Sequence, residues 1–316
     1  MNRDNAIAND IGSDGPIQVP LCIEATASGV EVSGDIKETS GEAKVTSAGL
    51  GCEKTYTLES TAQRKDDYPK SPRLVHEGKD QPAVRSGNRM FDALYALAYE
   101  ELRENSVTKI SDGAFNHGQP IACGTGGCFQ TGRKWTYVWT RDTAYAITLA
   151  LGALDPLRSQ NSLTFKTSEL RKGGGRQVVQ DMGSGGSYPI STDRVVWALG
   201  AWEVLKYLTG KERLAFRDLA YTTLKNTIEH DRLVIYDPQD GLYRGEQSFL
   251  DWREESYPLW VRDDPIHIGM PKALSTNTGH LRALEIAAAL AQEKGLSQAE
   301  TRYTTWAKAL KQAIRD

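Results

Sequence analysis

From about residue 86 to the end of the chain, apolar residues recur at the three- and four-residue spacing that is typical of α-helices. Residues 140–154, 192–208 and 277–294 are apolar on nearly every side, which predicts helices that other helices enclose. Helices with a polar side alternate with them, and these span residues 88–104, 157–171, 212–230 and 298–315. The pattern therefore predicts an inner and an outer layer of helices.

Local signals define the faces and ends of these elements. Gly210 and Gly295 follow the second and third enclosed helices, and we expect each glycine to end its helix. Residues 233–250 predict a hairpin with Asp240-Gly241 at its turn. In the first amphipathic helix, the face predicted to be buried consists of Phe91, Leu94, Tyr95, Ala98 and Leu102.

Enclosed helices that alternate with one-sided helices are the arrangement of an α/α toroid, whereas a four-helix bundle needs no second layer. We therefore predict an all-α fold, an (α/α) toroid of helical hairpins, over residues 86–316. The toroid is incomplete, because the chain offers three enclosed helices and a closed barrel of six hairpins contains twice that number.

Residues 1–85 have a different composition, rich in Gly, Ser, Thr and charged residues. Short alternating runs such as Val30-Glu31-Val32 and Thr55-Tyr56-Thr57-Leu58 predict weak strands, and partial disorder is the alternative. Prolines follow at positions 69, 72 and 82, as in a linker. We expect the domain boundary near residue 85.

Composition and charge exclude several classes of partner. With 39% hydrophobic residues and a net charge of −3, the chain has no general basis for binding nucleic acid or a membrane. No stretch approaches the roughly 18 apolar residues of a transmembrane helix. The start, Met1-Asn2-Arg3-Asp4-Asn5, lacks the apolar core of a secretory signal, so the default expectation is a cytoplasmic protein.

Cys123 and Cys128 bracket the sequence Gly-Thr-Gly-Gly, and two interpretations of the pair are open. The spacing suits a small disulfide loop in an oxidising compartment, but free thiols are preferred because no signal sequence is visible. A Cys-x4-Cys pair without a nearby set of histidines is a poor zinc site. We therefore expect no metal and no other cofactor.

The segment before the first enclosed helix combines aromatic and charged residues. Aromatic faces stack on the C–H surfaces of sugars, while a fixed Arg and Asp can bind the hydroxyl groups. The alternative is an aromatic strand that packs into the core, with Thr140 as the N-cap of the helix and an acidic residue stabilised by the helix dipole. The residues concerned are Trp135, Tyr137, Trp139, Arg141 and Asp142.

The other two enclosed helices also follow polar segments, Ser191-Thr192-Asp193-Arg194 and Leu274-Ser275-Thr276-Asn277. Any one of these residues alone is better interpreted as a helix cap. In a toroid, however, the segments before the inner helices open at one end, so their polar residues converge on one pocket. The repetition at three helix starts favours a binding site.

Residues 245–260 carry four carboxylates and one arginine, together with the large aromatic residues Trp252, Tyr257 and Trp260. A carboxylic acid between aromatic rings keeps its proton to higher pH, because desolvation disfavours its charged form. A general acid that protonates a glycosidic oxygen needs this property. The alternative is a solvated segment with one Arg–Glu pair.

Two of these motifs resemble those of known enzymes. Residues 139–144, Trp-Thr-Arg-Asp-Thr-Ala, resemble the Trp-Thr-Arg-Asp-Ser signature of glucoamylases, whose Arg-Asp pair holds the terminal glucose. Residues 246–252, Glu-Gln-Ser-Phe-Leu-Asp-Trp, resemble the Glu-Ser-Gly-Trp-Asp segment of trehalases and processing α-glucosidases, in which the Asp is the general acid. The segments at 191–194 and 274–277 are similar to substrate-lining loops of the same six-hairpin glycosidase superfamily. The resemblance covers about residues 86–316.

The resemblance implies an inverting, exo-acting glycoside hydrolase whose substrate is the terminal sugar of an oligosaccharide, an α-glucoside. It implies Asp251 as the general acid, with Glu254 as the second choice because glucoamylases use a glutamate. The residues that it implies around the terminal sugar are Trp139, Arg141, Asp142, Asp193, Arg194, Trp252, Arg253 and Asn277.

The general base of these enzymes is a glutamate from the last third of the barrel, and this chain offers no candidate for it. We expect that the sequence is a fragment of a longer protein; the alternative is a second subunit of a homo-oligomer that supplies the base. A second functional hypothesis is a non-catalytic carbohydrate-binding or scaffold protein that lacks the base.

Overall fold

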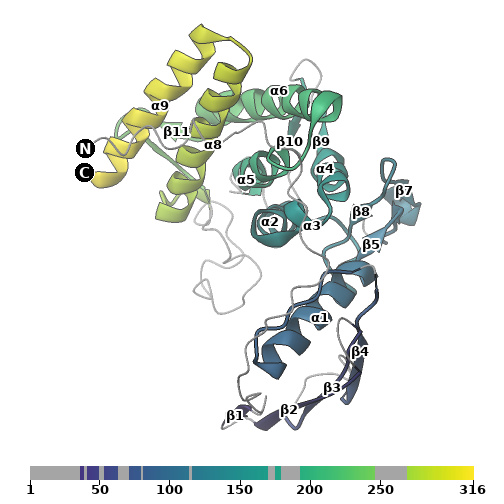
Figure 1. Cartoon of the computed structure of the whole chain (residues 1–316). Coiled ribbons are helices and arrows are strands. Elements are labelled where there is room, and N and C mark those ends of the chain that lie inside the picture. The colour runs from purple at the N-terminus through teal and green to yellow at the C-terminus, as the bar shows by residue number, and fades with distance from the viewer. Residues whose placement is uncertain are drawn as a thin grey trace. The chain divides into compact units, whose positions relative to one another are not determined.

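The computed structural model divides the chain into two compact units, one that ends at Asn105 and one that includes Ser106–Asp316 (Figure 1). We describe each unit by itself. The residues that the structure describes are 36–38, 41–49, 53–62, 71–79, 81–113, 116–169, 175–178, 193–245 and 269–316.

The N-terminal unit contains a four-stranded antiparallel sheet whose strands lie in sequence order. Strand alternation places Val45, Tyr56 and Val75 on one face, where they form a core with the helix α1 (Arg89–Glu104). The strand interpretation of this region is therefore confirmed for the residues described. The strands are β1 (Ile36–Glu38), β2 (Gly41–Ala48), β3 (Thr55–Ser60) and β4 (Arg73–His76).

Helix α1 begins where the sequence predicts it, but it buries a different face. Met90, Ala93 and Ala96 are buried against the sheet, whereas Phe91 and Leu94 are 56% and 48% exposed. The predicted face is wrong because the helix packs on a sheet rather than on other helices, and small side chains allow that close approach.

The N-terminal unit extends past the predicted boundary near residue 85. Arg85 donates to the buried Glu77 (2.8 Å), and Arg73 of β4 pairs with Glu100 of α1 (3.1 Å). The contact between Arg73 and Glu100 joins residues on both sides of the predicted boundary, so α1 belongs with the sheet and the unit ends at Asn105.

The second unit begins with short paired strands and then becomes helical (Figure 1). Its strand pairs are β5 (Ser106–Val107) with β8 (Cys128–Phe129), and β6 (Lys109–Ile110) with β7 (Ile121–Ala122). A short 3₁₀ helix, η1 (Asn116–Gly118), lies between β6 and β7. Cys123 and Cys128 form a disulfide, so the preferred expectation of free thiols is wrong for this pair.

The predicted helices of this unit are present with some changes at their ends. The run 140–154 is continuous and contains a π-helical segment, and 236–243 form the predicted hairpin. Its elements are α2 (Thr140–Ala146), η2 (Ile147–Leu151), α3 (Gly152–Leu154), α4 (Pro156–Phe165), β9 (Thr167–Ser168), β10 (Gln177–Val178), α5 (Asp193–Leu205), α6 (Gly210–Val234), β11 (Tyr236–Asp237), β12 (Leu242–Tyr243), α8 (Leu274–Glu293) and α9 (Ser297–Arg315).

Two helix ends differ from the prediction, and one glycine behaves as expected. Helix α4 ends at Phe165 because the chain then pairs as β9 with β10. Gly210 does not end α5; it begins α6 after Thr209. Gly295 has a positive φ of 68° directly after α8, so it ends that helix as predicted.

Helices α5 and α8 both run antiparallel to α6. The starts of α5 and α8 meet the end of α6, where Arg194 pairs with Asp231 and His280 Nε2 lies 3.5 Å from Asp231 Oδ2. A short connection joins α5 to the start of α6, and there Arg213 pairs with Glu293 near the end of α8 (3.1 Å). Helices α5 and α8 are therefore parallel to each other.

The run 140–154 is parallel to α5 as well. A β-carbon on Gly200 would lie 3.2 Å from the Cα of Ala144, and one on Gly152 would lie 3.2 Å from the Cγ of Glu203. The contacts thus advance in the same order along both helices. All three predicted inner helices share one direction, and their N-terminal ends lie at one end of this unit.

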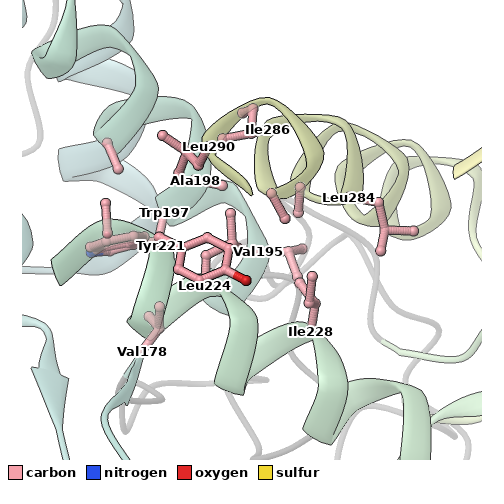
Figure 2. Close-up of a cluster of buried hydrophobic side chains, with 14 of the residues drawn as sticks. Val178, Val195, Trp197, Ala198, Tyr221, Leu224, Ile228, Leu284, Ile286 and Leu290 are labelled. Atoms are coloured by element: carbon pink, nitrogen blue, oxygen red, sulfur yellow. The ribbon is translucent and has the colours of Figure 1, made fainter. Parts of the chain in front are cut away.

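Helix α5 lies between α2, α4, α6 and α8, as Figure 1 shows. Its enclosed position explains the core in Figure 2, where Trp197 of α5, Leu224 of α6 and Leu290 of α8 are almost fully buried. The Trp197 indole donates to the Leu163 carbonyl of α4 (3.0 Å), so its polar atom is also satisfied. The outer helix α9 packs on α8 and buries Tyr303 and Leu310, seven residues apart on one side of the predicted one-sided helix 298–315.

The first inner helix is enclosed on one side only. Ile147 is fully buried, but Leu149 is 83% exposed, so the prediction of an enclosed helix is wrong on that side. The inner helices pack in the order α2, α5, α8, with α4, α6 and α9 beside them. The described residues thus form an arc of an α/α toroid, preceded by a β region, which confirms the predicted fold class. In the described part of the chain, every helix is too short or too polar to cross a membrane.

Candidate functional site

The segment before α2 forms a closed turn and not the alternating strand of one sequence interpretation. Gly132 and Trp135 exchange two backbone hydrogen bonds (3.1 and 3.0 Å), and Thr131 N–H donates to the Tyr137 carbonyl (2.9 Å). The Thr131 hydroxyl accepts from the Trp139 N–H (3.0 Å). These bonds fix the backbone directly before the start of α2.

The three aromatic residues of this turn lie in different environments. Tyr137 packs inward against Phe165 (5.7 Å between ring centroids), and the Lys166 ammonium lies 4.4 Å from its ring centre. Trp139 is half-buried and meets Tyr137 edge to face at 5.8 Å. Trp135 meets Trp139 edge to face at 6.5 Å and is 62% exposed. The cluster therefore combines an aromatic residue packed inward, Tyr137, with an exposed one, Trp135.

The Arg-Asp pair is divided between the interior and the surface. Arg141 is 5% exposed, whereas the Asp142 side chain is exposed in the first turn of α2. A carboxylate at this position is stabilised by the N-terminal end of the helix dipole. Thr140 is the first helical residue and Trp139 occupies the N-cap position, so the predicted threonine cap is not formed.

Arg194, predicted to contact a sugar, is fully buried and paired within the fold. Its guanidinium pairs with the buried Asp231 of α6 and donates to the Gln177 side chain (2.8 Å) and to the Val178 carbonyl (3.5 Å). Desolvation is the largest single influence and would raise the pKa of Asp231, but the charge of Arg194 together with the interactions of His230 and His280 lowers that pKa below its usual range. Arg194 therefore joins α5 to α6 and β10, and burial of its charge is tolerated because it is paired.

His280 completes this buried cluster and was missed by the sequence reasoning. Its Nδ1 lies 2.9 Å from the Thr276 carbonyl and therefore carries the proton, while its Nε2 faces Asp231. The ring stacks on Tyr243 with a centroid distance of 4.0 Å, and burial raises the pKa of Tyr243 to about 12. A single polar ring in the otherwise apolar helix 277–294 was the available signal.

Asn277 is also buried, and its side chain bonds to backbone atoms. Its Oδ1 accepts from the Tyr243 N–H (2.7 Å), and its Nδ2 donates to the Tyr243 carbonyl (2.9 Å) and the Ala273 carbonyl (3.0 Å). The amide thus continues the backbone pairing of the hairpin and attaches β12 to α8. Neither a cap nor a sugar contact describes this residue, because Ala273 occupies the N-cap position.

The described residues on either side of 246–268 are held together. Gly245 N–H donates to the Pro271 carbonyl (3.0 Å), and Gly245 forms an isolated bridge with Lys272. Lys272 and Arg244 both bind the Asp237 carboxylate (2.6 Å each), and the Lys272 hydrogen bond is the main cause of its lowered pKa. Both ends of that segment therefore leave the fold beside the start of α8.

The segment that precedes α5 is bounded in the same way. Val178 donates its N–H to the Thr227 hydroxyl (3.1 Å) and accepts from Arg194, the second residue of α5. Its two flanks thus lie near the end of α6, beside the starts of α5 and α8. Asp193 begins α5, but its side chain, together with Asp251, Trp252, Arg253 and Glu254, lies outside the described residues.

The resulting site is one end of the arc, where three helix starts, an aromatic cluster and the flanks of two further segments meet. Of the predicted sugar-binding residues that are described, Trp139, Arg141 and Asp142 lie together, and of these three only the Asp142 side chain is exposed. Arg194 and Asn277 instead hold neighbouring elements in place. An exposed carboxylate beside indole rings can bind hydroxyl groups while the rings contact apolar surface.

The chain matches no family model and no curated protein. Among solved structures it is similar to a family 76 glycoside hydrolase from a bovine Bacteroides thetaiotaomicron strain, with 15% sequence identity and a TM-score of 0.35. The alignment covers 83% of this chain and 62% of that one, so the chain spans less than two thirds of its length.

Proposed function

We propose that this chain carries the substrate site of an inverting glycoside hydrolase that acts on the terminal sugar of an oligosaccharide, where that sugar is an α-linked glucose. One observation carries the proposal: the three inner helices are parallel, so the aromatic and Arg-Asp start of α2 shares one end of the unit with the flanks of residues 246–268. Residues 246–268 contain the motif that resembles a glycosidase general-acid segment.

In this proposal Asp142 binds sugar hydroxyls from the surface, and Trp139 provides part of the aromatic wall. Arg141 is proposed to bind the terminal sugar from its buried position at the start of α2. Asp193, Trp252 and Arg253 are proposed to complete the sugar site, as the sequence motifs imply. Arg194 and Asn277 keep the neighbouring elements in place and contact no sugar.

The chemical step is protonation of the glycosidic oxygen by Asp251, with Glu254 as the second candidate. The bond between the anomeric carbon and that oxygen breaks as a water molecule attacks from the opposite face. A second carboxylate takes the proton of that water, at roughly 6.5–9.5 Å from the acid in inverting enzymes. We make no assignment of this base within the chain.

The test measures glucose release from aryl α-glucosides and from trehalose, with the chain assayed together with the domain or subunit that supplies the general base, because without that base it should be nearly inactive. Asp251→Asn should lower turnover by about 10²–10⁴-fold, because an amide cannot deliver the proton. Asp264→Asn, a carboxylate in the same segment to which we assign no role, is the matched control and should retain turnover. Full turnover by Asp251→Asn would exclude Asp251 as the acid, and Glu254→Gln would then be the variant to assay.

Calorimetric titration with glucose, maltose and mannose separates this proposal from a non-catalytic carbohydrate-binding protein. An enzyme should show both binding and Asp251-dependent turnover. Binding without turnover, unaltered by Asp251→Asn, would support the binding protein instead.

A further inference from the structure

Trp135 differs from every other tryptophan that the structure describes. It is 62% exposed, whereas Trp197 is fully buried and Trp139, Trp202 and Trp306 are half-buried or less exposed. Exposing an indole forfeits the free energy that its burial would contribute, and the fold gains nothing visible from leaving it in water. The exposed ring is therefore better explained by a ligand than by packing.

The backbone beneath this indole is held in place. Trp135 exchanges two hydrogen bonds with Gly132, and the next residue, Thr136, donates its hydroxyl to Asp112 Oδ2 (2.9 Å). A ring carried by a fixed turn loses little conformational entropy when it binds a ligand. The turn thus presents a pre-organised aromatic surface.

The position of the ring relates it to the proposed sugar site. Trp135 and Trp139 lie at 6.5 Å and almost perpendicular to each other, with an interplanar angle of 82°. Trp139 is already in contact with Tyr137 on its inner side, so Trp135 is the outer member of this pair. A ligand that reaches Trp139 and extends outward would meet the open part of the Trp135 ring.

We propose that Trp135 forms a second sugar position, which stacks the sugar unit next to the terminal one in an oligosaccharide. This inference rests on the proposed function and specifies its substrate as a chain of at least two sugars. A protein partner is the competing occupant, but the two residues directly before Trp135, Arg133 and Lys134, are exposed and charged, whereas the centres of protein interfaces are depleted of charge. A sugar combines an apolar C–H face with hydroxyl groups and suits a single ring among polar neighbours.

The test compares maltose with glucose by calorimetric titration of the full chain. Trp135→Ala should weaken maltose binding about tenfold and leave glucose binding within about twofold, because only the disaccharide reaches the second position. Trp135→Tyr should restore much of the maltose affinity, since it keeps an aromatic face. Phe91→Ala removes a similarly exposed aromatic ring from the N-terminal unit and should change neither affinity.

The outcomes separate this inference from the proposed function. If the wild type binds neither sugar, the proposed function fails and this inference fails with it. If both sugars bind and Trp135→Ala leaves their affinity ratio unchanged, the second sugar position alone is overturned. A change in oligomeric state with unchanged maltose affinity, measured by sedimentation, would also overturn it and assign the ring to a protein contact.

Discussion

Removing the charge of Asp231 tests the buried cluster that joins α5, α6 and α8. In the pair with Arg194, the two side chains are 2% and 0% exposed. Asp231→Asn keeps the shape of the side chain but leaves the arginine charge buried without its counter-ion. Breaking a buried ion pair in this way costs about 3–5 kcal/mol, so we expect the free energy of unfolding to fall by that amount at pH 7.

Urea unfolding followed by circular dichroism measures the loss. The matched control is Glu285→Gln, which breaks the half-exposed pair with Arg282 and should cost no more than about 1 kcal/mol. The double variant Arg194→Leu/Asp231→Leu should be more stable than Asp231→Asn, because it removes both buried charges. A loss for Asp231→Asn no larger than that of the control would refute the reasoning.

The same carboxylate predicts a pH dependence. The pKa of Asp231 is lowered in the folded protein, so its contribution to stability is complete above the unfolded-state value of about 3.9 and is lost as the pH falls further. The difference in unfolding free energy between wild type and Asp231→Asn should therefore be constant from pH 5 to pH 7, and should shrink below about pH 4. A difference that already shrinks between pH 7 and pH 5 would contradict the assignment.

Two further changes test other contacts. Asn277→Leu leaves the buried N–H and carbonyl of Tyr243 without partners, so it should lower the free energy of unfolding by about 2–5 kcal/mol in the same urea assay. Thr278→Ala changes an exposed position and should have little effect. Equal losses for the two variants would contradict the structural role of Asn277. Replacing Cys123 and Cys128 with serine opens a loop with a sequence separation of 5 and should cost about 2 kcal/mol. Two more labelled thiols in the wild type than in the variant, under denaturing and non-reducing conditions, would show that the disulfide does not form.

Much of the helical architecture follows from the sequence alone, because amphipathic period is a local property. Helix α9 buries Tyr303 and Leu310 as its spacing predicts, and Gly295 ends α8 because a residue with positive φ is needed there. The alternation of enclosed and one-sided helices also sufficed to predict an incomplete toroid. These features can be predicted from the sequence because they depend only on residues three or four positions apart.

What lies opposite a helix is decided by tertiary structure, and there the sequence predictions failed. Helix α1 packs Ala93 and Ala96 on a sheet, so its larger residues Phe91 and Leu94 remain exposed. The cysteine pair is a further example, since the spacing of Cys123 and Cys128 is compatible with either thiols or the disulfide that forms.

In the candidate site, too, some features follow from the sequence and others from tertiary structure. The start of α2 was identified from consecutive residues, and it does carry an exposed Asp142 beside aromatic rings. Arg194 and Asn277 had the right residue types for sugar binding, but their partners, Asp231 and the Tyr243 backbone, are 37 and 34 residues away. The sequence by itself determined which polar residues stand at the helix starts. Only the tertiary structure decided which of them are buried and bonded to other parts of the chain, because burial and pairing depend on segments that meet after the chain has folded.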